Sequence, residues 1–235
     1  MNKNLKKKFH SKGYFKIKIL PKNIINQFNN ELAKSIKLII ERKLKYKKKY
    51  RTNNKSWLVN DGLITLDKED HKLFVEIYDQ IPRSHIFFNI INHHKIINIV
   101  NELLERPKHN NLYINPASLR MDVPKNYKFS YGWHRDNNSN IPNSKFIQIW
   151  CPLINNIDLK LGGLHILNES HKYNLNTTSS KLEKELLSLN KTVRPKLNTK
   201  VHLKDSFQEE IITAKIGEVV FFNSALMHKS GLNKT

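Results

Sequence analysis

The apolar residues of this chain change their spacing near Pro107, and that change limits the folds the chain can adopt. Before Pro107 they recur at intervals of three and four residues, which is typical of amphipathic helices. After it they form short segments rich in β-branched and aromatic residues, separated by Pro, Gly and Asn. Helices followed by a run of strands favour an α+β chain. We therefore expect a mainly β core, a sandwich or barrel, covered on one side by the early helices.

The pattern defines the expected elements more closely. The predicted strands are Tyr14–Leu20, which follows a basic lead, and then Leu112–Val123, Lys145–Ile154, Gly163–Asn168 and Lys215–Asn223. The predicted helices run from a cap at Asn23 to about Lys45, over Asp67–Gln80 and over His85–Glu105. A polar insertion, Ser170–Gln208, holds one helix-like piece at Lys181–Leu189. No repeat or linker divides the chain, so we expect one domain, 1–235, with a helical lead over about 1–110 and a β core over about 111–235.

The chain is strongly basic, with 41 Lys and Arg against 20 Asp and Glu and a net charge of +21. Such a charge would attract nucleic acid without reading its sequence. However, lysine far exceeds arginine, and no helix-turn-helix, RNP or zinc-finger pattern accompanies the charge. We therefore expect no dedicated nucleic-acid binding. Basic side chains spread over all faces would mark a compositional bias, whereas one stripe leading to a pocket would favour an anionic substrate.

Several classes of protein are disfavoured. No window approaches 18 consecutive apolar residues, so no membrane span is expected. The basic start lacks an apolar stretch behind it and does not resemble a secretory signal peptide. The one cysteine, Cys151, excludes an intramolecular disulfide and a cysteine-based zinc site, and favours a cytoplasmic location.

The segment Gly132–Asp136, of sequence GWHRD, carries the chemistry. His134 and Asp136 are two residues apart, so in an extended backbone their side chains point to the same side. The best third ligand is His228, which follows the apolar segment Gly217–Phe222. Two histidines and one carboxylate leave positions of a divalent ion open, as in non-haem Fe(II) oxygenases. A lone H-x-D is weak evidence, and its surroundings matter more.

Four linked segments supply those surroundings. They are SLRMDVPKNYKFSYGWHRD (118–136), FIQIWCPLI (146–154), GGLHILNESHK (162–172) and GEVVFFNSALMHKSGLN (217–233). In order and spacing, over about residues 112–233, the chain resembles the phytanoyl-CoA dioxygenase family. The resemblance implies a double-stranded β-helix (jelly roll) that uses Fe(II) and 2-oxoglutarate. It also implies hydroxylation of a small organic molecule, since relatives that halogenate lack the carboxylate at the position of Asp136.

The resemblance assigns roles to individual residues. It makes His134, Asp136 and His228 the iron ligands and catalytic centre, and Ser230 a hydroxyl donor to the carboxylate of 2-oxoglutarate. Trp133, next to His134, is expected to shape the cofactor site. Gln148 and Trp150 alternate on one strand and are weaker candidates for the pocket, since Trp150 is equally suited to the core.

One family feature is missing. The arginine that binds the far carboxylate of 2-oxoglutarate normally lies beyond the distal histidine, but few residues follow His228 and none is arginine. Lysine reproduces bidentate guanidinium binding poorly. We expect either that the chain is truncated, which we favour, or that Arg120 or Lys234 substitutes. An alternative is a family member that has lost catalysis and acts as a binding module. The substrate, which could be anionic, and the oligomeric state cannot be read from the sequence.

Overall fold

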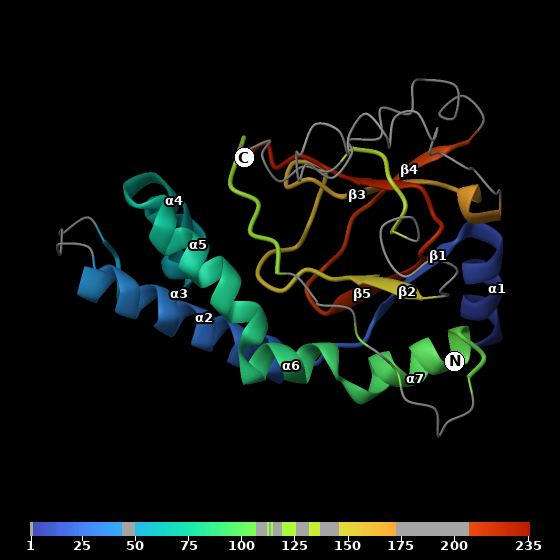
Figure 1. The fold of residues 1–235 in the computed structure, drawn as a ribbon, viewed down its shortest axis with the longest axis horizontal. Helices are drawn as coiled ribbons and strands as arrows, with labels where there is room; N and C mark the ends of the chain where they lie inside the picture. The colour runs from blue at the N-terminus through green and yellow to red at the C-terminus, as the bar shows by residue number, and fades with distance from the viewer. Residues whose placement is uncertain are drawn as a thin grey trace, which may run out of the picture.

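The computed structural model describes residues 2–43, 50–106, 112, 114, 119–125, 132–136, 146–172 and 207–235. The predicted helix Lys181–Leu189 and most of the insertion around it lie outside the described residues. The described part combines helices with two small antiparallel sheets, which confirms the α+β prediction (Figure 1).

The helical part occupies the first half of the chain. The helices are α1 (Lys3–Lys12), α2 (Lys22–Lys43), α3 (Lys55–Trp57), α4 (Leu63–Glu69), α5 (His71–Gln80), α6 (His85–Ile91) and α7 (His94–Leu103), with shorter turns η1 (Leu58–Gly62), η2 (Ile81–Arg83) and η4 (Ser170–Lys172). Helix α1 lies in the basic lead, for which no helix was predicted. It is capped by the Asn2 side chain and ends at Gly13, whose φ of 89° glycine adopts without strain.

Two predicted helices are each divided in the structure. Asp70 interrupts the first, because its backbone is extended and its carboxylate caps α5 by accepting the Lys72 N–H at 3.0 Å. His93 lies between α6 and α7, where it divides the second predicted helix, and it is only 8% exposed. Helix α2 begins at Lys22, which places Asn23 inside the helix and not at its cap.

The strands in the described part of the chain form two three-stranded sheets. The first has the order β1-β5-β2, from β1 (Tyr14–Lys18), β5 (Glu218–Asn223) and β2 (Ile147–Trp150). The second has the order β4-β3-β6, from β4 (Glu209–Ile212), β3 (Leu164–Leu167) and β6 (His228–Ser230). Strands β4 and β6 were not predicted. The described residues of the predicted strand Leu112–Val123 are not in a strand.

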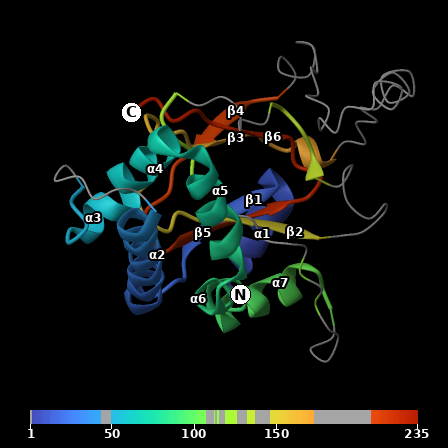
Figure 2. The ribbon, with the colours of Figure 1, turned by 60° about the vertical axis from the view of Figure 1, so that its left-hand side comes forward.

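Alternation along β1 and β5 gives the first sheet two buried faces. Phe15 and Phe221 stack with ring centroids 5.2 Å apart and belong to the core shared with the helices. Tyr14 and Phe222 alternate with them and join Ile166 of the second sheet in a separate cluster. Figure 2 shows the resulting layers, with the second sheet above the first and α6 and α7 below.

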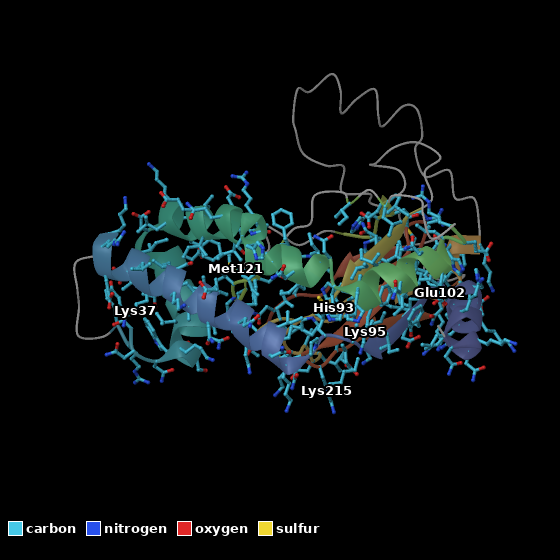
Figure 3. The ribbon with its side chains drawn as sticks, turned by 90° about the horizontal axis from the view of Figure 1, so that it is seen from below. Lys37, His93, Lys95, Glu102, Met121 and Lys215 are labelled. Carbon is cyan, nitrogen blue, oxygen red and sulfur yellow. The ribbon has the colours of Figure 1, made fainter. Side chains whose placement is uncertain are left out.

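The lysines labelled in Figure 3 lie on separate parts of the molecule: Lys37 on α2, Lys95 on α7 and Lys215 before β5. Among the described residues, no helix combines the length and apolar character that crossing a bilayer requires.

Candidate metal centre

The segment that holds His134 runs beside β6. His134 and His228 form an isolated antiparallel bridge: the His134 N–H donates to the His228 carbonyl at 2.9 Å, and the His228 N–H donates to the His134 carbonyl at 3.0 Å. A pair that exchanges both hydrogen bonds presents its side chains on the same face. The two imidazole rings accordingly lie 4.2 Å apart between centroids.

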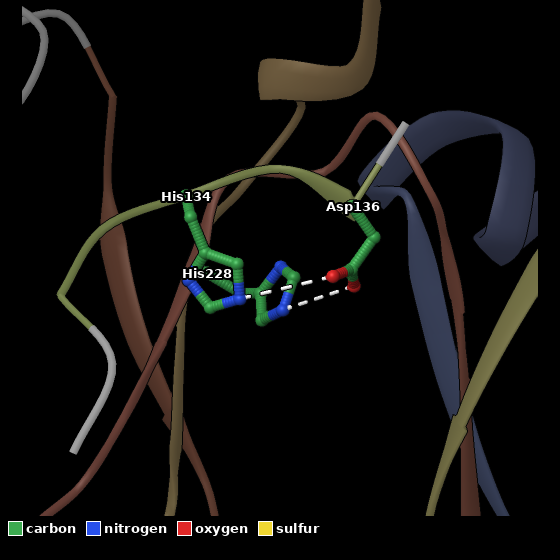
Figure 4. A group of neighbouring side chains, drawn as sticks. All are labelled: His134, Asp136 and His228. Atoms are coloured by element: carbon green, nitrogen blue, oxygen red, sulfur yellow. Dashed lines mark ion pairs between the residues drawn. The ribbon is translucent and has the colours of Figure 1, made fainter. Parts of the chain in front are cut away.

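Asp136 completes the group from two residues further along (Figure 4). Its N–H donates to the Ser224 carbonyl at 3.1 Å, which anchors the segment at the turn before β6. Its Oδ1 lies 3.8 Å from His134 Nε2, and its Oδ2 lies 3.3 Å from His228 Nε2. One ligand atom from each of the three residues lies within 4.8 Å of the others. The three predicted ligands are therefore brought together.

Backbone carbonyl groups fix the orientation of both imidazole rings through the Nδ1 atoms, on the edge of each ring away from Asp136. His134 Nδ1 lies 2.7 Å from the Gly132 carbonyl oxygen, and His228 Nδ1 lies 3.0 Å from that of Leu226. A carbonyl oxygen only accepts, so each Nδ1 carries the hydrogen, and in the neutral form of each ring the Nε2 lone pair faces Asp136. Backbone carbonyls orient metal-binding histidines in this way. The donor set therefore fits a divalent cation.

Burial favours the neutral form of His228. The residue is 5% exposed, and its ring meets the Phe222 ring edge-on at 4.9 Å. Burial lowers the pKa of the His228 imidazole to about 4; the neighbouring His134 adds to the shift, and the Asp136 carboxylate opposes it. A neutral imidazole is the form that binds a metal ion, so His228 is ready to bind at neutral pH.

Two further predicted residues meet beside the three ligands. Ser230 lies two residues beyond His228 in β6, and therefore on the same face. Arg120 Nη1 donates to the Ser230 hydroxyl, and Arg120 Nη2 lies 2.8 Å from Asp122 Oδ1. The other candidate cation, Lys234, is exposed. The structure thus joins Arg120, not Lys234, to the neighbourhood of Ser230.

Trp133, which directly precedes His134, has a described contact with Lys229. The Lys229 ammonium lies 4.6 Å from the centroid of its ring. Because neighbouring residues of paired strands alternate, Trp133 and Lys229 lie on the face of the bridge opposite the imidazoles. The expectation that Trp133 shapes the cofactor site stays a prediction, and its described contact is with Lys229.

Strand β2 supplies the two weaker candidates. Gln148 lies opposite Phe222 in the register, on the face toward the second sheet. Trp150, two residues on, packs against the cluster between the sheets, in agreement with a core role.

Comparison with known proteins places these residues in a wider group. The model of the family described as phytanoyl-CoA dioxygenase (PhyH) matches residues 9–235. No curated protein matches the chain.

Solved structures share the fold at low sequence identity. The non-heme alpha ketoglutarate dependent carbocyclase SnoK from nogalamycin biosynthesis has a TM-score of 0.59 and 13% identity, with 100% of this chain and 79% of that chain covered. The epimerase SnoN, in complex with Fe3+, alpha ketoglutarate and nogalamycin RO, has a TM-score of 0.57 and 11% identity, with 99% and 77% covered. AviO1 from Streptomyces viridochromogenes Tue57 has a TM-score of 0.53 and 12% identity, with 99% and 88% covered.

Proposed function

The chain belongs to the phytanoyl-CoA dioxygenase family, and from that premise we propose that it is an Fe(II)- and 2-oxoglutarate-dependent dioxygenase. We propose further that it hydroxylates a C–H bond of a small organic or acyl- or sugar-linked substrate. The observation that carries the proposal is the convergence of His134, Asp136 and His228, with both imidazole Nε2 atoms facing the carboxylate.

These three side chains would hold the iron. Two neutral imidazoles and one carboxylate supply three ligands from one side and leave the remaining positions open for a cosubstrate and oxygen. When bound, Fe(II) and 2-oxoglutarate supply the oxidising power for the reaction. The chain's own part is to orient the ligands through Gly132 and Leu226 and to limit water around His228, which is buried.

Arg120 and Ser230 would receive the carboxylate of 2-oxoglutarate. A guanidinium binds a carboxylate through two parallel hydrogen bonds, and a neighbouring hydroxyl can donate a third. Arg120 already reaches both Ser230 and the Asp122 carboxylate, so an incoming carboxylate would replace contacts of the same chemical kind. The same guanidinium is consistent with an anionic substrate. Trp133 would shape the cofactor site indirectly, from the face of the bridge opposite the imidazoles.

We propose a jelly roll for the β part, within a single domain over 1–235 whose helical lead covers about 1–110. The two antiparallel sheets that face each other, and the likeness to SnoK and SnoN, support this architecture. Those structures belong to a carbocyclase and an epimerase, so fold alone does not choose the reaction. The carboxylate of Asp136 supports hydroxylation over halogenation.

Metal and cosubstrate titration tests the proposal. Anaerobic Fe(II)-loaded protein should develop the visible charge-transfer band of the iron–2-oxoglutarate complex. His134→Ala and Asp136→Ala should weaken Fe(II) binding on the order of a hundredfold or more, since changes beyond the ligands themselves already cost tenfold to a hundredfold. Far-UV circular dichroism should stay unchanged. His85→Ala, which alters an exposed histidine on α6, is the matched control. Fe(II) binding that survives both ligand substitutions would refute the proposed centre.

A further inference from the structure

The two ligand-bearing segments are held in register by little backbone pairing. Among the described residues, the segment around His134 pairs with β6 through one bridge, the two hydrogen bonds between His134 and His228. A shift of one residue in such a pairing would turn a ligand to the other face. Side chains on the back of the bridge are therefore well placed to fix the register.

Trp133 and Lys229 are the residues directly opposite each other on that back face. In an antiparallel bridge between His134 and His228, the residue before His134 lies across from the residue after His228. The ammonium of Lys229 lies 4.6 Å from the centroid of the Trp133 ring, within the range of a cation–π interaction.

The Lys229 ammonium also pairs with a carboxylate of β4 in the same sheet. Lys229 Nζ lies 3.5 Å from Glu209 Oε1, and the same oxygen lies 2.6 Å from His165 Nδ1. The side chains of Lys229 and Glu209 are only 27% and 21% exposed, so water screens their attraction less than at an open surface. Lys229 is thus fixed between an aromatic ring and a carboxylate.

We propose that Trp133 and Lys229 are positioning residues for the metal centre: their contact across the back of the bridge holds His134 and His228 in register for one ion. The inference rests on the proposed function, since it concerns the same three ligands. In the register of the bridge both lie on the face opposite the imidazoles, so they would act through the backbone pairing between the histidines. When the contact is lost, metal binding has to order the His134 segment itself, and the affinity falls.

Cobalt(II) titration of purified protein, followed by visible absorption, tests this role without relying on turnover. Lys229→Met keeps the length of the side chain but removes its charge, and Trp133→Leu removes the ring. Each should raise the Co(II) dissociation constant about twofold to thirtyfold, the range that a cation–π contact supports. Because both remove the same contact, the double variant should lose much less than the two single losses combined.

Three controls separate positioning from general destabilisation. Lys229→Arg keeps a cation beside both partners and should restore binding close to the unaltered protein. Lys172→Met removes a lysine whose 2.9 Å ion pair with Glu169 is on the surface, and it should leave Co(II) binding unchanged. Urea midpoints of all variants show whether the fold is affected. Should Trp133→Leu fail to fold, the comparison of Lys229→Met with Lys229→Arg carries the test.

The outcomes are distinct. Unchanged Co(II) affinity in Lys229→Met, with binding abolished by His134→Ala, would overturn the positioning role and leave the proposed centre standing. Failure of the unaltered protein to bind Co(II), or binding that His134→Ala does not weaken, would overturn the proposed function itself. Fully additive losses in the double variant would overturn a direct Trp133–Lys229 contact.

Discussion

Replacing Gly231 by alanine would force apart two chain segments that meet at the end of β6. A Cβ on Gly231 would lie 2.3 Å from the carbonyl oxygen of Gly163 and 2.7 Å from the carbonyl carbon of Gly162. Both are backbone atoms, so no side-chain rotation relieves the contact. The Gly231 N–H also donates to that same Gly163 carbonyl at 2.9 Å, so the close approach is part of the pairing itself.

The cost follows from the distance. Carbon atoms reach favourable contact only beyond about 3.5 Å, so one segment must move by roughly 1 Å. That movement weakens the Gly231–Gly163 hydrogen bond, worth about 1 kcal/mol. Inserting a methyl group into a packed site adds strain of about 1–3 kcal/mol. We therefore expect Gly231→Ala to lower the free energy of unfolding by about 2–4 kcal/mol. For a chain of this size, Tm should fall on the order of 10 °C.

Thermal unfolding and Co(II) titration measure the two consequences. Since β6 carries His228 and Ser230, displacement of Gly231 should weaken metal binding as well as stability. Gly132→Ala is the matched control: Gly132 also lies near the metal centre, but a Cβ there meets no atom within 4 Å. Its Tm should stay within a few degrees of the unaltered protein. Equal Tm values for the two alanine variants would refute the reasoning from backbone contact.

Two further predictions concern charge. Arg120→Met should leave Co(II) affinity unchanged but weaken 2-oxoglutarate binding about tenfold to a hundredfold, because one charge-assisted interaction is lost. Anaerobic titration of the Fe(II)-loaded protein with 2-oxoglutarate measures this loss. Unchanged 2-oxoglutarate affinity would show that Arg120 does not bind the cosubstrate. His171 donates through Nε2 to the His10 carbonyl at 3.1 Å. The pKa of the His171 imidazole is lowered, and burial is the largest cause. The unfolded chain then binds more protons, so this contribution is complete above about pH 6.5 and is lost as pH falls below that value. Urea midpoints at pH 7.5 and 5.5 should differ less in His171→Asn, and an unchanged difference would contradict the assignment.

The metal ligands could be found from sequence because their geometry is local. An alternation of two residues puts His134 and Asp136 on one side of an extended segment, and the structure brings both side chains together although only His134 lies in the bridge. The third ligand needed more than spacing. His228 was chosen because it follows an apolar strand, and the pairing with His134 that places it could not be read from one chain.

The sequence analysis missed elements whose apolar pattern is too short to recognise or continues across a break. Strand β6 has only three residues, too few to show an alternation, although it carries His228 and Ser230. The division at Asp70 was hidden because apolar residues keep helical spacing on both sides of it. The contact between Trp133 and Lys229 was missed because cross-strand partners depend on register, which the sequence does not display.

Strand β5 explains how the helical layer can influence the metal centre. Its residues Val219 and Phe221 face the core shared with the helices, while Val220 and Phe222 face the second sheet. Phe222 in turn meets the His228 ring edge-on. Because side chains alternate strictly along a strand, the helices cannot displace Phe221 without moving Phe222. The helical layer therefore fixes the position of β5, and through Phe222 it limits where the buried His228 can lie.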